Sequence, residues 1–257
     1  FGDEGVGQMT GHRIRTVGVI PARYGSTRFP GKPLVKLLNR PLLQWVIEGA
    51  QTSKCLEEIW VATDHHEIRE MAEGLGVRTV MTEPDLPTGS DRVYQAVRHD
   101  EVEIVVNIQG DEPLISGALL DTLVQPLLED QELEMATLGR PLRPGDLESP
   151  NTAKIVLNCR SEALYFSRLP IPYSRIDAPE RRAIGLKHIG LYAFRKSFLA
   201  EFCAQSPTPL ELAEGLEQLR ALYLGARIKV VEVEHESWGV DTPGDVSKVE
   251  ALLRLRK

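Results

Sequence analysis

The sequence contains few cysteines, with three in 257 residues, and these are Cys55, Cys159 and Cys203. Their number is odd, they lie far apart, and no two of them form a C-x-x-C pattern. This usage suggests neither a disulfide framework nor a zinc knuckle as the basis of the fold. We therefore expect the chain to work in a reducing, cytoplasmic environment.

Long apolar runs and an excess of positive charge are also absent. No apolar stretch approaches the roughly 20 residues that a membrane helix requires, so we expect no membrane insertion, and we expect no signal peptide ahead of the first strand. Thirty basic residues against 37 acidic residues give a formal net charge of −7. This balance argues against nucleic acid or an anionic membrane as a general partner. The predicted partner is a small anionic molecule that local basic clusters recognise.

Three common catalytic motifs are missing as well. The chain has no G-x-x-x-x-G-K-[ST] run, no G-x-G-x-x-G run and no H-E-x-x-H run. A kinase, a nicotinamide enzyme or a zinc protease therefore loses its usual sequence support. The pair His65 and His66 follows Asp64 at a predicted helix start, where adjacent side chains point apart. A metalloenzyme that uses this pair is consequently a weak alternative.

The patterns that are present predict an α/β fold. With 42% hydrophobic residues the chain can bury a full core, and strand and helix patterns alternate as in stacked βαβ units. The first half predicts parallel strands at 16–20, 58–63, 77–81 and 103–108, with helices opening at Pro41 and over 65–74, 90–98 and 116–129. Strands at 134–138, 153–157, 163–166 and 186–194 follow with little helix between them, which favours antiparallel pairing. Helices at 196–204 and 209–222, a strand at 228–233 and a helix from Pro243 complete the chain.

Residues 20–34 form a loop that combines three cations with glycine and proline directly after the first strand. Gly25 and Gly31 permit close backbone approach, and Arg23, Arg28 and Lys32 supply the charge. Further residues stiffen the loop or offer hydroxyls, namely Pro21, Pro30, Pro33, Ser26 and Thr27. Arginine can hold phosphate with two parallel donors, whereas lysine acts as a movable point charge. A solvated basic loop is the simpler alternative, but the position after a strand of an α/β fold favours a polyphosphate site.

Polar clusters also follow other predicted strands or open helices. Thr88 and Ser90 stand at a helix start, where helix capping by Ser90 and base recognition are equally good explanations. In Asn107-Ile-Gln-Gly-Asp-Glu-Pro113 an apolar strand ends in an amide and two carboxylates. Thr242, Pro243 and Asp245 are a favourable helix start, which leaves Asp241 unexplained. Together Asp111 and Asp241 would make an open oxygen-ligand Mg²⁺ site.

Taken together, these residues closely resemble the 3-deoxy-manno-octulosonate (Kdo) cytidylyltransferases, also called CMP-Kdo synthetases. The resemblance runs from about Thr16 to the C-terminus. The motifs that carry it are IPARYGSTRFPGKPL at 20–34, VATD at 61–64, TGSDR at 88–92, NIQGDEP at 107–113, ALYFSRLPIPY at 163–173, KHIGLYAF at 187–194, LEQLR at 216–220 and GVDTP at 239–243. The CMP-sialic acid synthetases share the early basic loop, but the later segments resemble the Kdo branch.

The resemblance implies a Rossmann-like nucleotidyltransferase fold with a mainly parallel mixed sheet and a smaller antiparallel portion for dimerisation and sugar binding. Within residues 1–15, the part before Met9 would be a foreign remnant, and the rest would lead into the first strand. Residues 16–257 would be one nucleotidyltransferase domain with an inserted interface and sugar-side segment near 150–195. A homodimer is implied too, with Pro170 to Tyr173 as an interface segment.

The resemblance also implies the site. Its nucleotide-binding positions fall on Arg23, Ser26, Arg28, Lys32, Ser90 and Gln109, its magnesium aspartates on Asp111 and Asp241, and its sugar-acid positions on Arg168, His188, Glu217 and Gln218. The catalytic set would be Arg23, Arg28, Lys32 and Asp111. The family usually has Ser-Gly-Thr where this chain has Thr88-Gly-Ser90, and Leu212 stands where relatives are often polar.

Taken one by one, the sugar-side residues also have structural explanations. Arg168 could simply end a strand at the surface, His188 could be a satisfied, partly buried histidine, and Glu217 and Gln218 could lie on a solvated helix face. As a set, a guanidinium, an imidazole, a carboxylate and an amide suit a substrate with one carboxylate and several hydroxyls.

The implied reaction is attack by the anomeric 2-hydroxyl of Kdo on the α-phosphorus of CTP, which gives CMP-Kdo and pyrophosphate for lipopolysaccharide or capsule. Such a transfer needs positioning and cations more than a protein nucleophile, and metal activation of the hydroxyl is the preferred account. Two alternatives stay open at this point. One is a cytidylyltransferase for another sugar acid, such as 8-amino-Kdo or a sialic acid. The other is a nucleotide sensor without catalysis, which would need no pair of metal-binding aspartates.

Overall fold

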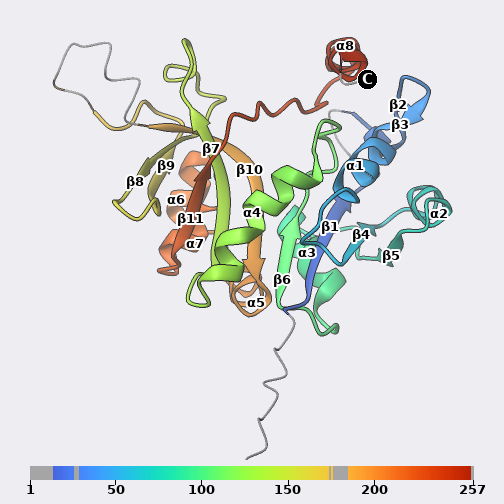
Figure 1. Cartoon of the computed structure of the whole chain (residues 1–257), viewed down its shortest axis with the longest axis horizontal. Coiled ribbons are helices and arrows are strands. Elements are labelled where there is room, and N and C mark those ends of the chain that lie inside the picture. The colour runs from blue at the N-terminus through green and yellow to red at the C-terminus, as the bar shows by residue number, and fades with distance from the viewer. Residues whose placement is uncertain (1–13, 26–28, 174, 176–184, 256–257) are drawn as a thin grey trace, which may run out of the picture.

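The structure is a computed structural model and describes residues 14–25, 29–173, 175 and 185–255. One twisted nine-stranded sheet runs through it, with helices on both faces (Figure 1). Seven strands lie in the spatial order β11 (Ile228–Glu232), β7 (Met135–Pro141), β10 (Leu186–Arg195), β6 (Ile104–Asn107), β1 (Thr16–Ala22), β4 (Glu58–Thr63) and β5 (Arg78–Met81). Beside this path, β8 (Lys154–Leu157) pairs with β10 and with β9 (Ala163–Ser167).

The change of strand direction predicted from the sequence is confirmed. β6, β1, β4 and β5 are parallel neighbours. β10 then runs antiparallel to β6, β7 and β8, and β8 runs antiparallel to β9. At the far edge β11 returns parallel to β7. The carboxyl ends of β1 and β6 therefore lie at the same edge of the sheet, where α/β folds bind their ligands.

Each face of the sheet packs against its own helices. Because alternate residues of a strand point to opposite faces, Val19 of β1 belongs to one apolar core and Ile20 to the other. The Val19 core is closed by α3 (Gly89–Val97), α5 (Lys196–Ala204) and α7 (Leu219–Tyr223). The Ile20 core is closed by α1 (Leu42–Ala50), α2 (His66–Gly74) and α4 (Gly117–Glu129). The result is a three-layer arrangement with the sheet in the middle.

A third, smaller apolar cluster packs the C-terminal helix against the rest of the fold. Val249 and Leu253 of α8 (Asp245–Leu255) pack with Leu37 and Leu42. Leu37 belongs to a small hairpin of β2 (Lys36–Leu37) and β3 (Arg40–Pro41), which the sequence did not predict. This packing brings the C-terminal helix beside the loop that follows β1, although the two are more than 200 residues apart in sequence.

Two predicted helix boundaries were wrong. The helix expected over 209–222 is interrupted, because Gly215 adopts a left-handed φ of 61° and ends α6 (Pro209–Glu214). A short α7 then begins at Leu219. The last helix begins at Asp245 and not at Pro243. Glu217 and Gln218 consequently lie in a turn between two helices.

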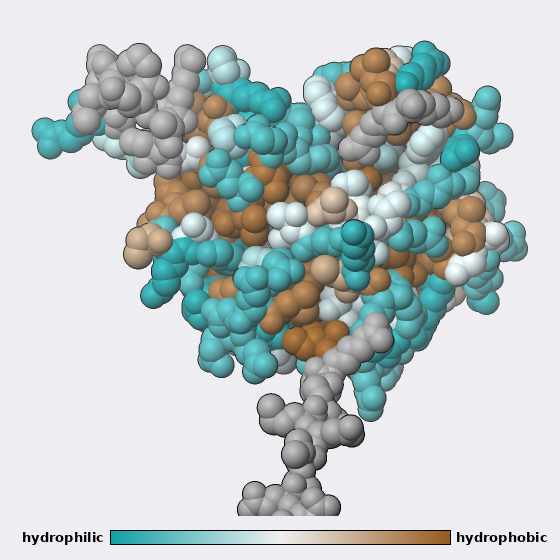
Figure 2. Space-filling view, in the orientation of Figure 1, coloured by the Kyte–Doolittle hydropathy of each residue, from teal (hydrophilic) through white to brown (hydrophobic). Residues whose placement is uncertain are grey.

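The outer surface is mixed in character. In the orientation of Figure 2, hydrophilic side chains cover much of the periphery, while apolar side chains gather in the upper middle of the face, around β7 and β10. In the part of the chain that the structure describes, none of the helices has the length and apolar character needed to cross a membrane.

Candidate active site

A cavity of about 320 Å³ opens at the carboxyl ends of β1 and β6. β1 ends in its wall, and the segments after β6 and before α3 form two further sides. The lining residues include Pro21, Ala22, Arg23, Lys32, Thr88, Gly89, Arg92, Gln109, Gly110, Asp111 and Asp241. Three predicted groups, the basic loop, the start of α3 and the end of β6, therefore meet at one place.

The described parts of the basic loop are held at both ends. After β1, the backbone N–H of Tyr24 donates to Asp64 at 3.2 Å, and the Tyr24 ring stacks on His65 with centroids 3.9 Å apart. Where the description resumes, Gly31 has a φ of 68° and donates its N–H to the Tyr24 carbonyl at 3.0 Å. A left-handed residue here suits glycine and directs the chain into the short 3₁₀ helix η1 (Lys32–Leu34).

Arg23 and Lys32 line the cavity as the sequence predicts. Ser26 and Arg28, which were also predicted to hold the nucleotide, lie outside the described residues. The stacking of His65 on Tyr24 gives that histidine a place beside the loop. No group of three or more histidine, cysteine or acidic side chains suited to a metal occurs among the described residues.

Lys32 lies between the two aspartates that the sequence analysis paired. Its Nζ is 2.6 Å from Oδ2 of Asp111 and 3.5 Å from Oδ1 of Asp241. These carboxylates come from positions 130 residues apart, and the fold brings them to one ammonium group at the end of the cavity. Two carboxylates facing one lysine leave a local excess of negative charge, which suits a further cation.

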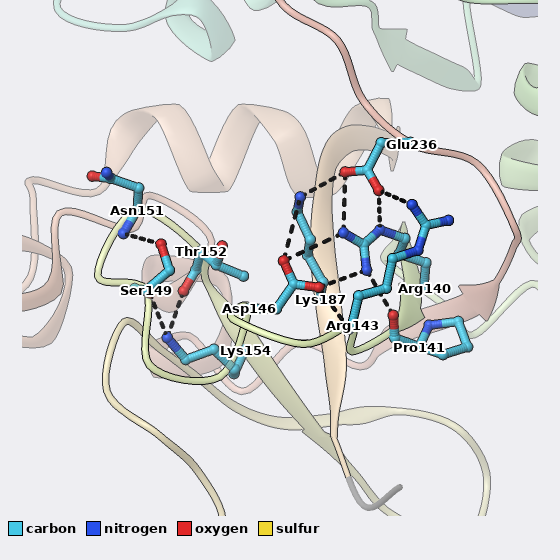
Figure 3. A network of polar contacts seen from close by, with 10 residues as sticks. All are labelled: Arg140, Pro141, Arg143, Asp146, Ser149, Asn151, Thr152, Lys154, Lys187 and Glu236. Carbon is cyan, nitrogen blue, oxygen red and sulfur yellow. Dashed lines mark hydrogen bonds and ion pairs between the residues drawn. The ribbon is translucent and has the colours of Figure 1, made fainter. Parts of the chain in front are cut away.

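A buried ion network fixes the C-terminal segment that carries Asp241 (Figure 3). The Arg140 guanidinium of β7 lies 2.8 Å from Glu236 and 2.8 Å from Asp146. Lys187 of β10 adds a contact of 2.7 Å to Glu236. These partners lower the pKa of Glu236 and of Asp146 against the opposing effect of burial. The segment before Asp241 is therefore anchored to the central sheet.

Further hydrogen bonds bring the two metal candidates together. The N–H of Val240 donates to the carbonyl of Asp111 at 3.0 Å, and Ser237 donates its hydroxyl to the Glu112 carboxyl. Burial raises the pKa of Glu112 to about 7, an effect that this hydrogen bond from Ser237 opposes. The segment before Asp241 is thus tied to residues 111 and 112 by two hydrogen bonds, which hold Asp241 beside Asp111.

The first residue of α8, Asp245, also helps to hold the backbone at Asp241. Oδ2 of Asp245 accepts the backbone N–H groups of Asp241 and Thr242 at 3.1 and 2.8 Å. These bonds lower the pKa of Asp245. The helix begins two residues later than predicted, and the Asp245 carboxylate satisfies N–H groups of the residues just ahead of it. The Asp241 side chain is left facing the cavity.

The donor set at this point fits Mg²⁺. Magnesium prefers oxygen ligands and commonly takes only one or two carboxylates from the protein, with water and substrate phosphates as the other ligands. Asp111 and Asp241 offer that number of carboxylates. Lys32 lies where it could contact phosphate oxygens that share such an ion.

At the start of α3 the capping residue is Thr88 and not Ser90. Thr88 and Asp91 form a reciprocal capping box, in which each side chain accepts the other's backbone N–H. Ser90 is buried, and its hydroxyl points inward. It donates to Oε2 of Glu217 at 3.1 Å and accepts from Nδ2 of Asn107 at 3.4 Å. Of the two residues predicted to contact the base, Gln109 lines the cavity and Ser90 lies beneath its wall.

Arg92 is a cavity residue that the sequence analysis did not select. It is 3% exposed and lines the cavity from α3. Its guanidinium lies 3.6 Å from the Asp64 carboxylate and donates to the hydroxyl of Thr82. Burial lowers the pKa of Arg92, while Asp64 opposes that change. The TGSDR motif contained this arginine, but helical spacing alone gave no reason to place it inside.

The four predicted sugar-side residues gather around the turn between α6 and α7. Arg168 follows β9, His188 lies in β10, and Glu217 and Gln218 are in the turn itself. Nε and Nη2 of Arg168 donate to the carbonyls of Glu214 and Gly215 at 2.7 and 3.2 Å. The guanidinium thus supports the end of α6, where backbone carbonyls lack helical partners. The explanation of Arg168 as a plain surface residue is therefore incomplete.

His188 and Gln218 contact each other. The Gln218 amide lies 3.4 Å from Nδ1 of His188, and its oxygen accepts from the Tyr192 hydroxyl at 3.1 Å. The imidazole packs edge-on against Phe166 with centroids 5.1 Å apart. Burial lowers the pKa of His188 to about 3. The ring is consequently neutral at physiological pH.

Glu217 connects the two halves of the site. Oε2 accepts from Ser90, while Oε1 is buried and has no hydrogen-bond partner among the described residues. Burial raises the pKa of Glu217, while the nearby hydroxyls of Thr88 and Ser90 oppose the change. A buried acceptor of this kind can receive a substrate hydroxyl. Glu217 was predicted on a solvated helix face or at the sugar, and its burial excludes the solvated face.

Comparison with known proteins gives the family. A family model described as cytidylyltransferase matches residues 17–228. The 3-deoxy-manno-octulosonate cytidylyltransferase of Bdellovibrio bacteriovorus is 56% identical over 242 residues, which are 93% of this chain and 98% of the relative. The enzyme of the same name from Geobacter sulfurreducens is 46% identical over 250 residues, covering 94% of this chain and all of the relative.

Solved structures agree with this. A structure of CMP:2-keto-3-deoxy-manno-octonic acid synthetase complexed with CTP has a TM-score of 0.89 and 40% identity, and it covers 95% of this chain and 100% of that one. A cytidylyltransferase from Leptospira borgpetersenii shares the fold with a TM-score of 0.64 at 19% identity, covering 95% of this chain and 88% of that one. The expected Rossmann-like fold is confirmed. The chain belongs to the 3-deoxy-manno-octulosonate cytidylyltransferase family.

Proposed function

We propose that this chain transfers CMP from CTP to the anomeric hydroxyl of Kdo and releases pyrophosphate, which supplies an activated sugar for lipopolysaccharide or capsule. The observation that carries the proposal is the meeting of Lys32, Asp111 and Asp241 at the end of the cavity. A nucleotide sensor needs phosphate contacts but has no use for paired carboxylates beside the phosphate lysine. Family membership favours the same activity.

The cations of the cavity would bind the triphosphate. Arg23 and Lys32 come from the two ends of the basic loop, and Arg92 adds a buried guanidinium from α3. Charge that develops on the phosphate oxygens during transfer is stabilised best by cations that are already in place. Gln109, with an amide that both donates and accepts, would face the base or ribose.

Mg²⁺ would be held by Asp111 and Asp241 and would neutralise phosphate charge when bound. Lys32 lies between these carboxylates. The lysine, a movable point charge, would contact phosphate oxygens of a triphosphate bound in the cavity.

Glu217 would orient the sugar acid. Its unpartnered Oε1 can accept a hydroxyl, and the turn that carries it is held from β9 by Arg168 and from β10 by His188. Because Ser90 donates to Glu217 from just beneath the cavity wall, a sugar bound by Glu217 would lie next to the nucleotide. Holding the two substrates in the correct relative position can lower the activation free energy of such a transfer by up to about 7–11 kcal/mol.

The proposal includes a homodimer and a cytoplasmic location. Exposed apolar side chains on β9 and the segment after it, Leu164, Leu169 and Tyr173, favour a partner surface there. The three free cysteines favour a reducing compartment. Sedimentation at several protein concentrations tests the dimer, and a monomer at micromolar concentration would contradict it.

A pyrophosphate-release assay tests the activity. CTP is supplied with Kdo, 8-amino-Kdo or a sialic acid, with and without Mg²⁺. We expect rapid release with CTP, Kdo and Mg²⁺ together, and little release when either the sugar or the ion is omitted. Equal rates without Mg²⁺, or faster release with another sugar acid, would contradict the proposal.

A further inference from the structure

Thr137 of β7 is fully buried against an irregular part of β10. In the pairing of the two strands, Leu138 lies opposite Ile189 whereas Thr137 lies opposite Tyr192, so two residues of β10 bulge between them. The Thr137 hydroxyl lies 2.8 Å from the carbonyl of Leu191 and 3.3 Å from that of Ile189. It therefore satisfies backbone carbonyls at the bulge. Bulges of this kind often redirect side chains next to active sites.

The same hydroxyl fixes the proton on His188. Oγ1 of Thr137 is 3.0 Å from Nε2 of His188. A carbonyl can only accept a hydrogen bond, so the single hydroxyl proton of Thr137 goes to Leu191 or Ile189. The oxygen is then left as an acceptor for the histidine. Because the ring is neutral, Nε2 carries its one proton and Nδ1 is the acceptor.

The protonation of His188 in turn fixes the orientation of the Gln218 side-chain amide. Nδ1 of His188 accepts from the Gln218 amide nitrogen at 3.4 Å, and the Gln218 oxygen accepts from Tyr192 at 3.1 Å. All these bonds run in one direction, from Tyr192 through Gln218 and His188 to Thr137. Gln218 is only 3% exposed, and a reversed amide would place its oxygen against the unprotonated Nδ1 of His188, acceptor to acceptor, with no solvent to compensate.

We propose that Thr137 is a positioning residue for the sugar-acid half of the site, acting by holding His188 as its Nε2–H tautomer and thereby fixing the amide of Gln218 in one orientation. The turn that carries Glu217 is then fixed from the β10 side. The effect on the sugar rests on the proposed function, while the tautomer itself does not. Neither nitrogen of His188 is left to bind substrate, so His188 acts through Gln218.

The tautomer is measured on the free, full-length protein. Two-dimensional ¹H–¹⁵N spectra of the imidazole groups distinguish a protonated Nε2 from a protonated Nδ1, and the spectrum of His188→Gln assigns the signal. We expect wild type and Thr137→Ser to show Nε2–H, and Thr137→Val, which keeps the side-chain shape but lacks the hydroxyl, to show a mixture. A wild-type Nδ1–H form, or an unchanged tautomer in Thr137→Val, would overturn the proposal.

Kinetics give a second, separate measurement. In Thr137→Val the KM for Kdo should rise about five- to tenfold, as expected for one lost hydrogen bond, while the KM for CTP stays within about twofold. Thr137→Ser should restore the KM for Kdo. A purely structural role would instead lower activity with both substrates alike and would overturn the proposal.

Tyr192→Phe serves as the second variant if Thr137→Val does not fold. It removes the hydroxyl at the other end of the chain and leaves β7 intact. We expect it to keep the Nε2–H form of His188 and to raise the KM for Kdo. A switch to Nδ1–H in Tyr192→Phe would show that Gln218, and not Thr137, sets the proton. If no sugar is turned over, the proposed function fails, but the spectra still decide the tautomer.

Discussion

Ser90 and Glu217 are joined by a hydrogen bond of 3.1 Å between residues 127 positions apart in sequence. Ser90 lies in the first turn of α3, directly beneath the cavity wall formed by Thr88 and Gly89, whereas Glu217 belongs to the turn between α6 and α7. The bond therefore links the nucleotide half of the site to the sugar half. Both side chains are largely buried, so solvent competes little with the contact.

Removal of this hydroxyl is expected to weaken use of the sugar. Ser90→Ala deprives the buried Glu217 carboxyl of a donor, and a hydrogen bond to a charged group is worth about 1.5–3 kcal/mol. We expect kcat/KM for Kdo to fall about 10- to 100-fold. Steady-state kinetics with varied Kdo measure this, and Ser206→Ala, at an exposed serine, is the control. An unchanged kcat/KM for Kdo in a stably folded Ser90→Ala protein would contradict the linkage.

Loss of the phosphate lysine is expected to slow the chemical step. Lys32→Ala removes the ammonium between Asp111 and Asp241, and removal of one preorganised electrostatic donor typically costs on the order of 10²–10³ in kcat. Turnover at saturating CTP, Kdo and Mg²⁺ gives this value. Lys36→Ala changes an exposed lysine four residues further on and should keep wild-type turnover. Near wild-type turnover in Lys32→Ala would remove Lys32 from the proposed role.

Loss of one aspartate is expected to abolish the response to magnesium. Asp111→Asn keeps the size of the side chain but removes a charge, and Mg²⁺ binds carboxylates far better than amides. We expect activity at least about 100-fold lower at millimolar Mg²⁺. Asp85→Asn, in an exposed turn, is the matched control. A magnesium titration that gives the same curve for Asp111→Asn and wild type would move the ion elsewhere.

The neutral state of His188 has a consequence for acid stability. Burial lowers its pKa from 6.5 to about 3. Between these values the unfolded chain binds the proton and the folded protein does not, so the free energy of unfolding falls as the pH falls below about 6.5. The loss is at most about 1.4 kcal/mol per pH unit.

His188→Gln removes this titration while keeping an amide nitrogen near the position of Nε2. Urea unfolding at pH 7 and pH 5 should therefore show a smaller drop for the variant than for wild type. Equal drops in both proteins would mean that the imidazole of wild type is already protonated, or exposed, at pH 5.

Much of the fold could be predicted because it depends on periodicity. The apolar runs of β1, β4 and β6 and the change to closely spaced strands after residue 134 predicted the parallel and antiparallel parts. The interruption at Gly215 was missed. A glycine inside an apolar helical pattern does not by itself reveal a left-handed φ.

The candidate site was predictable where function leaves a local pattern. The basic loop and the carboxylates at the end of β6 follow strands, so their residue types and positions made Arg23, Lys32 and Asp111 candidates, and the family resemblance supplied their roles. Arg92 and Thr137 could not, because their importance comes from what the fold places beside them. Thr137 is an ordinary β-branched residue in a strand pattern, and only the bulge in β10 brings its hydroxyl to His188.

The most direct test of the central claim is ³¹P NMR of the complete reaction. The protein is incubated with CTP, Kdo and Mg²⁺, and the phosphorus signals are followed with time. We predict the loss of the three CTP signals with the appearance of one sugar phosphodiester and one pyrophosphate in equal amounts. Unchanged CTP, or CMP and pyrophosphate without a sugar phosphodiester, would contradict the assignment of this chain as a transferase that joins CMP to Kdo.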